Sequence, residues 1–313
     1  MESASTYDLA FSLDWEYDWD FLRLVEEEAR ARGLRTLAVS PANVAACLEE
    51  LRSGRLGFRV LLDRASPTSP EFLDFQTAAI ERGLDVIEPA DRLRWASDKA
   101  TMHLEFISHG LHTPYTLIMP SLESAPEPSR RPAELAPLGL PFVIKPANTT
   151  GGSLGVVESA SSLDEFLTAR RSYPSDKYLL QEKIIPDEKD GRRFWFRGFF
   201  ILGEVHCTWW DDRTHVYAEL AEAEIERYAL QPLEEIVRAI AEISRLRFFS
   251  TEIVRDVRRR FIAVDYVNET CDMRLQSLHA DGVPDAVVRK TAARIASYIA
   301  ETASAGVGHC AGS

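Results

Sequence analysis

The sequence predicts an α/β protein in which a parallel, doubly wound sheet comes first and a mixed region of helices and longer strands follows. Over residues 1–90, short apolar runs alternate with capped helical segments, and strands separated by helices are typical of a parallel sheet. After residue 115, strand-like runs surround a glycine-rich loop. The chain of 313 residues is long enough for two or three compact units.

The N-terminal region contains four apolar runs of strand length. They lie at residues 7–13, 35–39, 58–62 and 84–87. The helical segments between them begin at capping residues or first-turn prolines and end at Gly33, Gly54 and Gly83. This regular alternation is the basis for the parallel sheet.

The segment after the first strand excludes a nicotinamide dinucleotide site. It reads DWEYDWD, whereas such a site needs GxGxxG, because bulky side chains cannot sit where the pyrophosphate approaches the backbone. Trp15, Tyr17 and Trp19 lie within this segment, at the edge of the sheet where ligands of α/β proteins collect. Packing beneath the following helix and contact with a substrate are both open roles for them.

Residues 140–158 contain a strand, a lysine and a glycine-rich loop. Phe142–Ile144 is a short apolar run suited to a buried strand, and Lys145 ends it. Thr149–Gly155 consists mainly of small residues before Val156 resumes an extended pattern. Glycine lets backbone N–H groups approach phosphates closely, and lysine adds a point charge. The loop is not a Walker-type P-loop, because GxxxxGK[ST] spacing is absent and a strand follows.

The remaining segments complete the expected order of elements. We expect helices at 97–109, 162–171, 232–246 and 284–302, strands at 115–119, 178–185 and 194–205, and a hairpin of 251–255 with 258–267. Asp98-Lys99 falls in the first turn of the first of these helices, although a lysine is not favoured there by the helix dipole.

Composition narrows the class of protein. The net charge of −13 disfavours nonspecific nucleic-acid binding by the whole molecule. No run approaches 18 apolar residues, and the N-terminus lacks the pattern of a signal peptide, so neither a membrane span nor secretion is expected. The four cysteines are scattered without a CxxC pair, which favours free thiols in a reducing cytoplasm.

Taken in order, these features resemble the ATP-grasp superfamily, which includes D-alanine–D-alanine ligases and glutathione synthetases. The resemblance spans about residues 95–275 and rests on Asp98-Lys99, on Lys145 with its glycine loop, on QEKI at 181–184, on Arg197, and on the acidic and amide residues of the hairpin. It implies a Rossmann-like N-terminal domain at 1–95, a two-lobed α+β ATP-grasp domain at 96–303 with a lid at about 112–185, and a flexible tail at 304–313.

The resemblance also implies roles for individual residues. Phosphate contacts are expected from Lys99, Lys145, Gly151, Gly152 and Ser153, and adenine contacts from Gln181, Glu182, Lys183 and Ile184. Asp187 is the candidate for the ribose, although Glu188 and Asp190 are alternatives. Arg197 and Lys145 are the expected catalytic residues, and Glu252, Asp265 and Asn268 the expected metal ligands. Arg274 and Trp209 are the candidate substrate contacts, with pairing of Arg274 to Asp272 and core packing of the tryptophan as the alternatives.

The metal ligands depart from the usual family pattern. Asp265 and Asn268 are three residues apart, so a regular strand would point them to opposite faces. A bulge, or a strand that ends near Tyr266, would bring them together. Glu269 is the alternative ligand, because it has the same parity as Asp265. The proline-glycine pair that usually follows the asparagine is also missing.

The resemblance implies an ATP- and Mg²⁺-dependent ligase, with Mn²⁺ as an alternative ion. It would activate a small-molecule carboxylate as an acylphosphate for attack by an amine. A small-molecule kinase on the same scaffold and a nucleotide-binding regulatory protein without turnover are the alternatives. Nucleic-acid and membrane partners are not expected, and a homodimer is one option for the assembly.

Overall fold

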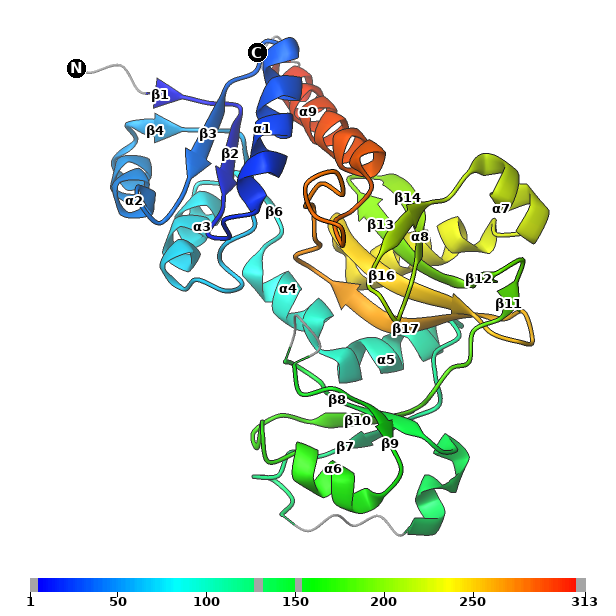
Figure 1. Cartoon of the computed structure of the whole chain (residues 1–313). Helices are drawn as coiled ribbons and strands as arrows, with labels where there is room; N and C mark the ends of the chain where they lie inside the picture. Colours follow the sequence, from blue (N-terminus) through cyan, green and yellow to red (C-terminus); the bar gives the residue numbers. More distant parts are fainter. Residues whose placement is uncertain (1–4, 127–131, 150–153, 308–313) are drawn as a thin grey trace.

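Figure 1 shows the computed structural model, which describes residues 5–126, 132–149 and 154–307. Three bodies follow one another: an N-terminal sheet with its helices, a small lid at the bottom of the view, and a larger central sheet. Helices α4 (Ala90–Ser97) and α5 (Lys99–Ser108) run between them. The chain therefore leaves the N-terminal body, forms the lid, and returns to build the central sheet.

The N-terminal body is a four-stranded parallel sheet in the order β3-β2-β5-β6. Its strands are β2 (Leu9–Ser12), β3 (Thr36–Val39), β5 (Val60–Asp63) and β6 (Asp85–Ile87), each within a few residues of an expected strand. A separate parallel pair joins β1 (Ser5–Thr6) to β4 (Leu56–Gly57). Helices α2 (Val44–Ser53) and α3 (Glu71–Glu81) share one core with the sheet, and α1 (Asp18–Ala31) and α9 (Asp285–Val307) share another.

The helix expected at 97–109 is present as α5, and the structure adds a further helix, α4, directly before it. The break lies at Asp98, whose extended backbone separates α4 from α5. The Asp98 carboxylate accepts hydrogen bonds from the N–H groups of Ala100 at 2.9 Å and Thr101 at 3.2 Å. Asp98 is therefore the N-cap residue, and Lys99 opens the helix on the side that faces the lid.

The lid is a four-stranded antiparallel sheet in the order β7-β10-β8-β9. Its elements are β7 (Thr116–Met119), the 3₁₀ helix η1 (Pro132–Leu138), β8 (Phe142–Pro146), β9 (Val157–Ala160), α6 (Leu163–Ala169) and β10 (Tyr178–Glu182). Phe142, Ile144 and Tyr178 bury one face of the sheet against Phe166 of α6. Because strand side chains alternate, Lys145 points to the other face, toward the central sheet.

The central sheet is antiparallel, in the order β15-β14-β13-β16-β17. Its strands are β13 (Trp195–Ile201), β14 (Glu204–Trp210), β15 (Tyr217–Glu219), β16 (Phe248–Arg255) and β17 (Phe261–Asn268). The small pair β11 (Glu188–Lys189) and β12 (Arg192–Arg193) precedes it, and α7 (Glu222–Tyr228) and α8 (Pro232–Ser244) lie between β15 and β16. Residues of α8 share a core with one face of the sheet.

The opposite face of the central sheet is divided between packing and polar groups. Phe199, Ile201 and Phe248 belong to the core that includes α1 and α9. Arg197 and Glu252 lie further along the same face, two residues from Phe199 and four from Phe248. The half of the face that carries Arg197 and Glu252 is therefore not part of this core.

One expected strand is two strands in the structure. Residues 194–205 were read as a single extended run, but the chain reverses between β13 and β14. Leu202 and Gly203 form the two-residue turn, with φ of 49° and 96°, in the left-handed region that such hairpin turns require. The leucine hid the turn, because its side chain continues the apolar pattern of FFIL.

The C-terminal helix is longer than expected. α9 continues to Val307, so residues 304–307, which were expected in a flexible tail, are helical, while 308–313 lie outside the described part of the chain. None of the helices in the described residues is long and apolar enough to cross a membrane.

The contact between β13 and α8 gives a test of the packing. A Cβ atom built at Gly198 would overlap Val237 Cγ2, whereas one at Gly57 would meet Thr6 Cγ2 at an ordinary 3.8 Å. We expect Gly198→Ala to destabilise the fold by roughly 1–3 kcal/mol through overpacking. Adding Val237→Ala to this variant should recover part of the loss. Thermal unfolding checks this, and a Gly198→Ala midpoint equal to that of Gly57→Ala would contradict the close approach.

Candidate active site

Lys145 links the lid to the central sheet. The side chain extends from β8, is only 8% exposed, and donates from Nζ to the carbonyl oxygen of Val264 in β17 at 2.9 Å. Val264 immediately precedes Asp265. The lysine therefore lies beside the strand that carries the predicted metal ligands.

Arg197, Glu252 and Asp265 form one row across three adjacent strands. Arg197 is paired with Glu252 between β13 and β16, and Glu252 is paired with Asp265 between β16 and β17. Arg197 Nη2 lies 2.7 Å from one oxygen of Glu252, and Trp195 Nε1 donates to the other at 3.0 Å. Three predicted site residues thus share one face because of the register of the sheet.

The structure brings Asn268 to Asp265 despite their spacing. Between β16 and β17 the register shifts, so that the two-residue step from Ser250 to Glu252 opposes the three-residue step from Asn268 to Asp265. Such an extra residue is a bulge, and it returns both side chains to one side. Asn268 Nδ2 donates to Asp265 Oδ2 at 2.9 Å.

The charges in this cluster influence one another. Burial lowers the pKa of the Lys145 ammonium and Lys99 lowers it further, whereas Asp265 and Glu252 act in the opposite direction. Burial alone would raise the pKa of the Asp265 carboxyl, but Lys145, Lys99 and Arg197 outweigh it and hold that pKa below its usual value. Both lysines therefore lie close enough to act on the same carboxylate, which stays ionised at neutral pH.

Tyr266 packs against the side chain of Lys145. Its ring centroid lies 5.4 Å from Lys145 Nζ, and its hydroxyl bonds with His103 Nδ1 at 2.9 Å and accepts from Gln181 Nε2 at 2.7 Å. Burial, with a smaller contribution from Lys145, lowers the pKa of His103 to about 4, so this histidine is neutral at pH 7. Sequence reasoning missed this support, because a tyrosine in FIAVDYV reads as an ordinary core residue.

The start of the glycine loop is held by Asp176. Its carboxylate accepts from the backbone N–H of Asn148 at 2.9 Å and of Thr149 at 3.1 Å, and from Asn148 Nδ2 at 2.7 Å. Lys99 Nζ donates to the Thr149 carbonyl at 3.1 Å, so Lys99, which was predicted to contact phosphate, also contacts this segment. Gly151, Gly152 and Ser153, predicted as phosphate contacts, lie outside the described residues. Asp176 was missed because an aspartate in a polar turn carries no signal of its own.

Asp98 and Lys177 make a second contact beside the loop. Lys177 Nζ donates to the Asp98 carboxylate at 2.6 Å, and Lys99 N–H donates to the Ala147 carbonyl at 3.0 Å. The start of α5, which carries Lys99, is therefore tied to the end of β8 and to the beginning of β10, which lie side by side at one end of the lid sheet.

The predicted adenine segment lies at the end of β10. The strand ends at Glu182, so Lys183 and Ile184 follow its last paired residue. The side chain of Gln181 is buried and donates to Thr116 and Tyr266, which commits it to the junction of lid and body. Asp187, predicted for the ribose, is fixed by Arg255 Nη2 at 2.7 Å.

Trp209, one of the two predicted substrate contacts, lies on the opposite face of the central sheet. Trp209 is 4% exposed and packs against Phe194 and Phe196 in the core beneath the sheet, so the structure does not bring it to the site. Strand alternation places its neighbour Trp210 on the site face, where the Arg197 guanidinium lies over its ring.

Arg274 has its charge partners within its own loop. It pairs with Asp272 at 2.7 Å and Asp281 at 3.0 Å, and these bonds raise the pKa of the guanidinium above its usual value. The exposed rings of Trp15 and Tyr17 lie beside this guanidinium. Arg274 therefore joins this loop to the N-terminal body.

The donor set suits Mg²⁺ on chemical grounds. Within the described residues, no three His, Cys, Asp or Glu side chains are grouped closely enough to hold a metal ion. Glu252, Asp265 and Asn268 offer instead two carboxylates and an amide on adjacent strands. Mg²⁺ prefers such oxygen donors and usually completes its shell with water and substrate phosphates, so an incomplete protein set fits it.

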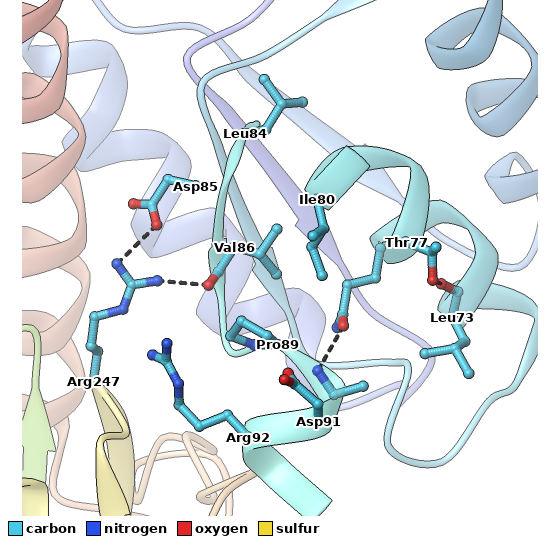
Figure 2. A pocket seen from close by; sticks show the side chains of 12 residues that line it. Leu73, Thr77, Ile80, Leu84, Asp85, Val86, Pro89, Asp91, Arg92 and Arg247 are labelled. Carbon is cyan, nitrogen blue, oxygen red and sulfur yellow. Dashed lines mark hydrogen bonds and ion pairs between the residues drawn. The ribbon is translucent and has the colours of Figure 1, made fainter. Parts of the chain in front are cut away.

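A hollow of about 640 Å³ lies away from this cluster, at the edge of the N-terminal sheet (Figure 2). Its walls come from α3, β6 and α4, with Leu73, Ile80 and Val86 among the apolar groups. Arg247 enters it but is already bonded to Asp85 at 2.9 Å and to the Val86 carbonyl at 2.6 Å. It contains none of the predicted site residues, and we assign no chemistry to it.

Comparison with known proteins gives a consistent result for the fold. No protein-family model matches the sequence, and no curated protein matches it. Several solved structures match the fold of the chain. A RimK-domain ATP-grasp protein from Sphaerobacter thermophilus DSM 20745 is 20% identical with a TM-score of 0.63, over 93% of this chain and 98% of that one.

Two further structures agree. D-cycloserine synthetase DcsG is 17% identical with a TM-score of 0.60, over 94% of this chain and 100% of that one. Macrocyclase MdnC from Microcystis aeruginosa MRC, bound with its precursor peptide MdnA, is 12% identical with a TM-score of 0.60, over 95% of this chain and 100% of that one. With these matches along nearly its whole described length, the chain has the fold of the ATP-grasp superfamily, as the order of its motifs predicted.

Proposed function

We propose that this protein is an ATP- and Mg²⁺-dependent ligase that joins a carboxylate to an amine. The observation that carries the proposal is the position of two cations beside Asp265: Lys145 donates to the adjacent Val264 carbonyl at 2.9 Å, and Arg197 lies 2.7 Å from Glu252, which is paired with Asp265. Together with Lys99, which acts on the pKa of the Asp265 carboxyl, three cations lie near two carboxylates, Asp265 and Glu252, and outnumber them by one. The excess positive charge suits a bound triphosphate and its metal ion.

The residues divide the chemistry between them. Lys99 and Lys145 neutralise the charge of phosphate oxygens. The backbone N–H and C=O groups at Lys183 and Ile184 form hydrogen bonds with the edge of the adenine base. Glu252, Asp265 and Asn268 hold Mg²⁺, which supplies charge neutralisation on the phosphates when bound. Arg197 stabilises the negative charge that develops on the transferring group.

The reaction then takes two balanced steps. A carboxylate oxygen attacks the γ-phosphorus, the bond to the bridging oxygen breaks, and ADP leaves. The amine nitrogen next attacks the acyl carbon, inorganic phosphate departs, and the nitrogen loses a proton. No enzyme nucleophile is required, and the lid excludes water that would hydrolyse the acylphosphate.

Relatives of similar fold support this class of reaction. D-cycloserine synthetase and the peptide macrocyclases are among them, and one PsnB structure is a complex with a minimal precursor, Mg and ADP. Both small molecules and peptides therefore belong in a substrate screen. The acid and the amine themselves are left to that screen.

Removing either central charge should stop turnover. We expect Lys145→Ala and Asp265→Ala each to lower ADP formation by roughly a hundredfold or more, because each acts where phosphate charge is neutralised. The assay is ADP release with Mg²⁺, ATP and panels of amino acids and short peptides, with circular dichroism to check folding. Lys189→Ala, which removes an exposed lysine on β11, is the control. A near-normal rate in either site variant would refute the role of that residue.

The fate of the phosphate distinguishes a ligase from a kinase. With ATP, Mg²⁺, the acid substrate and hydroxylamine in place of the amine, we expect a hydroxamate of the acid and release of inorganic phosphate. The reason is that hydroxylamine attacks an acylphosphate at its carbonyl carbon. A product that keeps the phosphate and yields no hydroxamate would instead identify a kinase.

The anchor of the glycine loop should affect nucleotide binding. Asp176→Asn removes the charge from an acceptor of three N–H groups, and charge-assisted hydrogen bonds are roughly twice as strong as neutral ones. We expect the Kd for Mg²⁺–AMPPNP to rise roughly tenfold, measured by calorimetry. Asp164→Asn on lid helix α6 is the matched control. An unchanged Kd in Asp176→Asn would show that the loop is held without this carboxylate.

A further inference from the structure

Arg197 lies in the middle of a row whose two sides differ in chemistry. On one side, toward β17, the row is charged, and on the other side, toward β15, it is aromatic. The aromatic members are Trp210 on β14 and Tyr217 on β15, which pair directly across the two strands. Thr208 pairs with Arg197, so Trp210, two residues further on, is the diagonal neighbour of Arg197 on the same face.

Two contacts fix the Arg197 guanidinium. Its Nη2 atom lies 2.7 Å from Glu252, and its Cζ atom lies 4.8 Å from the centroid of the Trp210 ring. Its Nε atom is buried and has no hydrogen-bond partner among the residues that the structure describes. Such a donor is costly unless a ligand or water accepts from it, so the guanidinium is held by its neighbours while its Nε donor is left for an incoming oxygen.

The Trp210 ring is itself held in place. His215 stacks on it, with ring centroids 5.5 Å apart and planes 7° apart, and Tyr217 lies 4.3 Å away at 54°. The turn that presents His215 is closed by backbone bonds, because His215 N–H donates to the Asp211 carbonyl at 2.8 Å and Asp211 N–H to the Val216 carbonyl at 3.0 Å. A braced tryptophan can in turn restrict the arginine that lies over it.

We propose that Trp210 is a positioning residue for Arg197, holding the guanidinium over its indole ring so that the free Nε donor faces the transferring phosphoryl group. The proposal rests on the proposed function, in which Arg197 contacts that group. The ion pair with Glu252 sets the distance between the Arg197 guanidinium and the proposed metal ligands. Trp210 fixes the plane of the guanidinium, which an ion pair through one nitrogen leaves free to rotate.

The test uses nucleotides alone, because the acid and amine are not identified. AMPPNP carries a γ-phosphate analogue and ADP lacks one, so the ratio of their affinities isolates the contribution of the γ-phosphate. Calorimetry with Mg²⁺ gives this ratio for the wild type and for Trp210→Leu, Trp210→Phe, Arg197→Ala and the double variant Trp210→Leu/Arg197→Ala. Trp19→Leu, an exposed tryptophan on α1, is the matched control.

We expect Trp210→Leu to lower the AMPPNP/ADP affinity ratio roughly 3- to 30-fold, the range of a cation–π contact. Trp210→Phe, which keeps an aromatic face, and Trp19→Leu should stay within about twofold of the wild type. In the Arg197→Ala background, Trp210→Leu should change the ratio by less than about twofold, because residues that act through one contact are not additive.

Two results would overturn the inference. One is an unchanged ratio in Trp210→Leu, and the other is an equal loss from Trp210→Leu with and without Arg197, which would indicate general damage to the site. A wild type that binds neither nucleotide would instead contradict the proposed function, so the two failures are distinguishable.

Discussion

The site depends on the contact of Lys145 with β17. Lys145 extends from the lid and donates a hydrogen bond to the Val264 carbonyl. Burial lowers the pKa of Lys145 and Asp265 counteracts this, and Lys145 and Lys99 both lower the pKa of Asp265. Burying an ammonium is costly unless acceptors and counter-charges surround it, and Val264, Asp265 and Glu252 meet that need. The same contact, together with the hydrogen bond from Gln181 to Tyr266, joins the lid to the central sheet, so the placement of the lid is linked to the charged cluster.

The central sheet places the remaining groups by register alone. Arg197, Glu252 and Asp265 align because β13, β16 and β17 are adjacent, and the bulge in β17 adds Asn268. On the opposite face Gly198 allows Val237 of α8 to approach closely, which sets the distance between α8 and β13. The charged row is therefore a product of strand pairing and not of any one loop.

Local sequence was enough to predict most of the elements and the charged members of the site, because lysine, arginine and carboxylates in apolar strands are unusual. Local sequence was not enough to predict a contact when the second residue of that contact lies far away in the chain. The supports of Lys145 and of the loop, Tyr266 and Asp176, come from other segments, and the choice of Trp210 over Trp209 depends on which face the strand buries. The Leu202-Gly203 turn was missed because leucine rarely adopts a positive φ.

The most direct test of the account is a crystal structure with Mg²⁺ and AMPPNP. The account predicts that the ammonium groups of Lys99 and Lys145 both contact phosphate oxygens, and that Asp265 coordinates the metal. It would be contradicted by a nucleotide bound elsewhere, such as in the hollow beside β6, or by a triphosphate beside Lys99 and Lys145 whose metal makes no contact with Asp265.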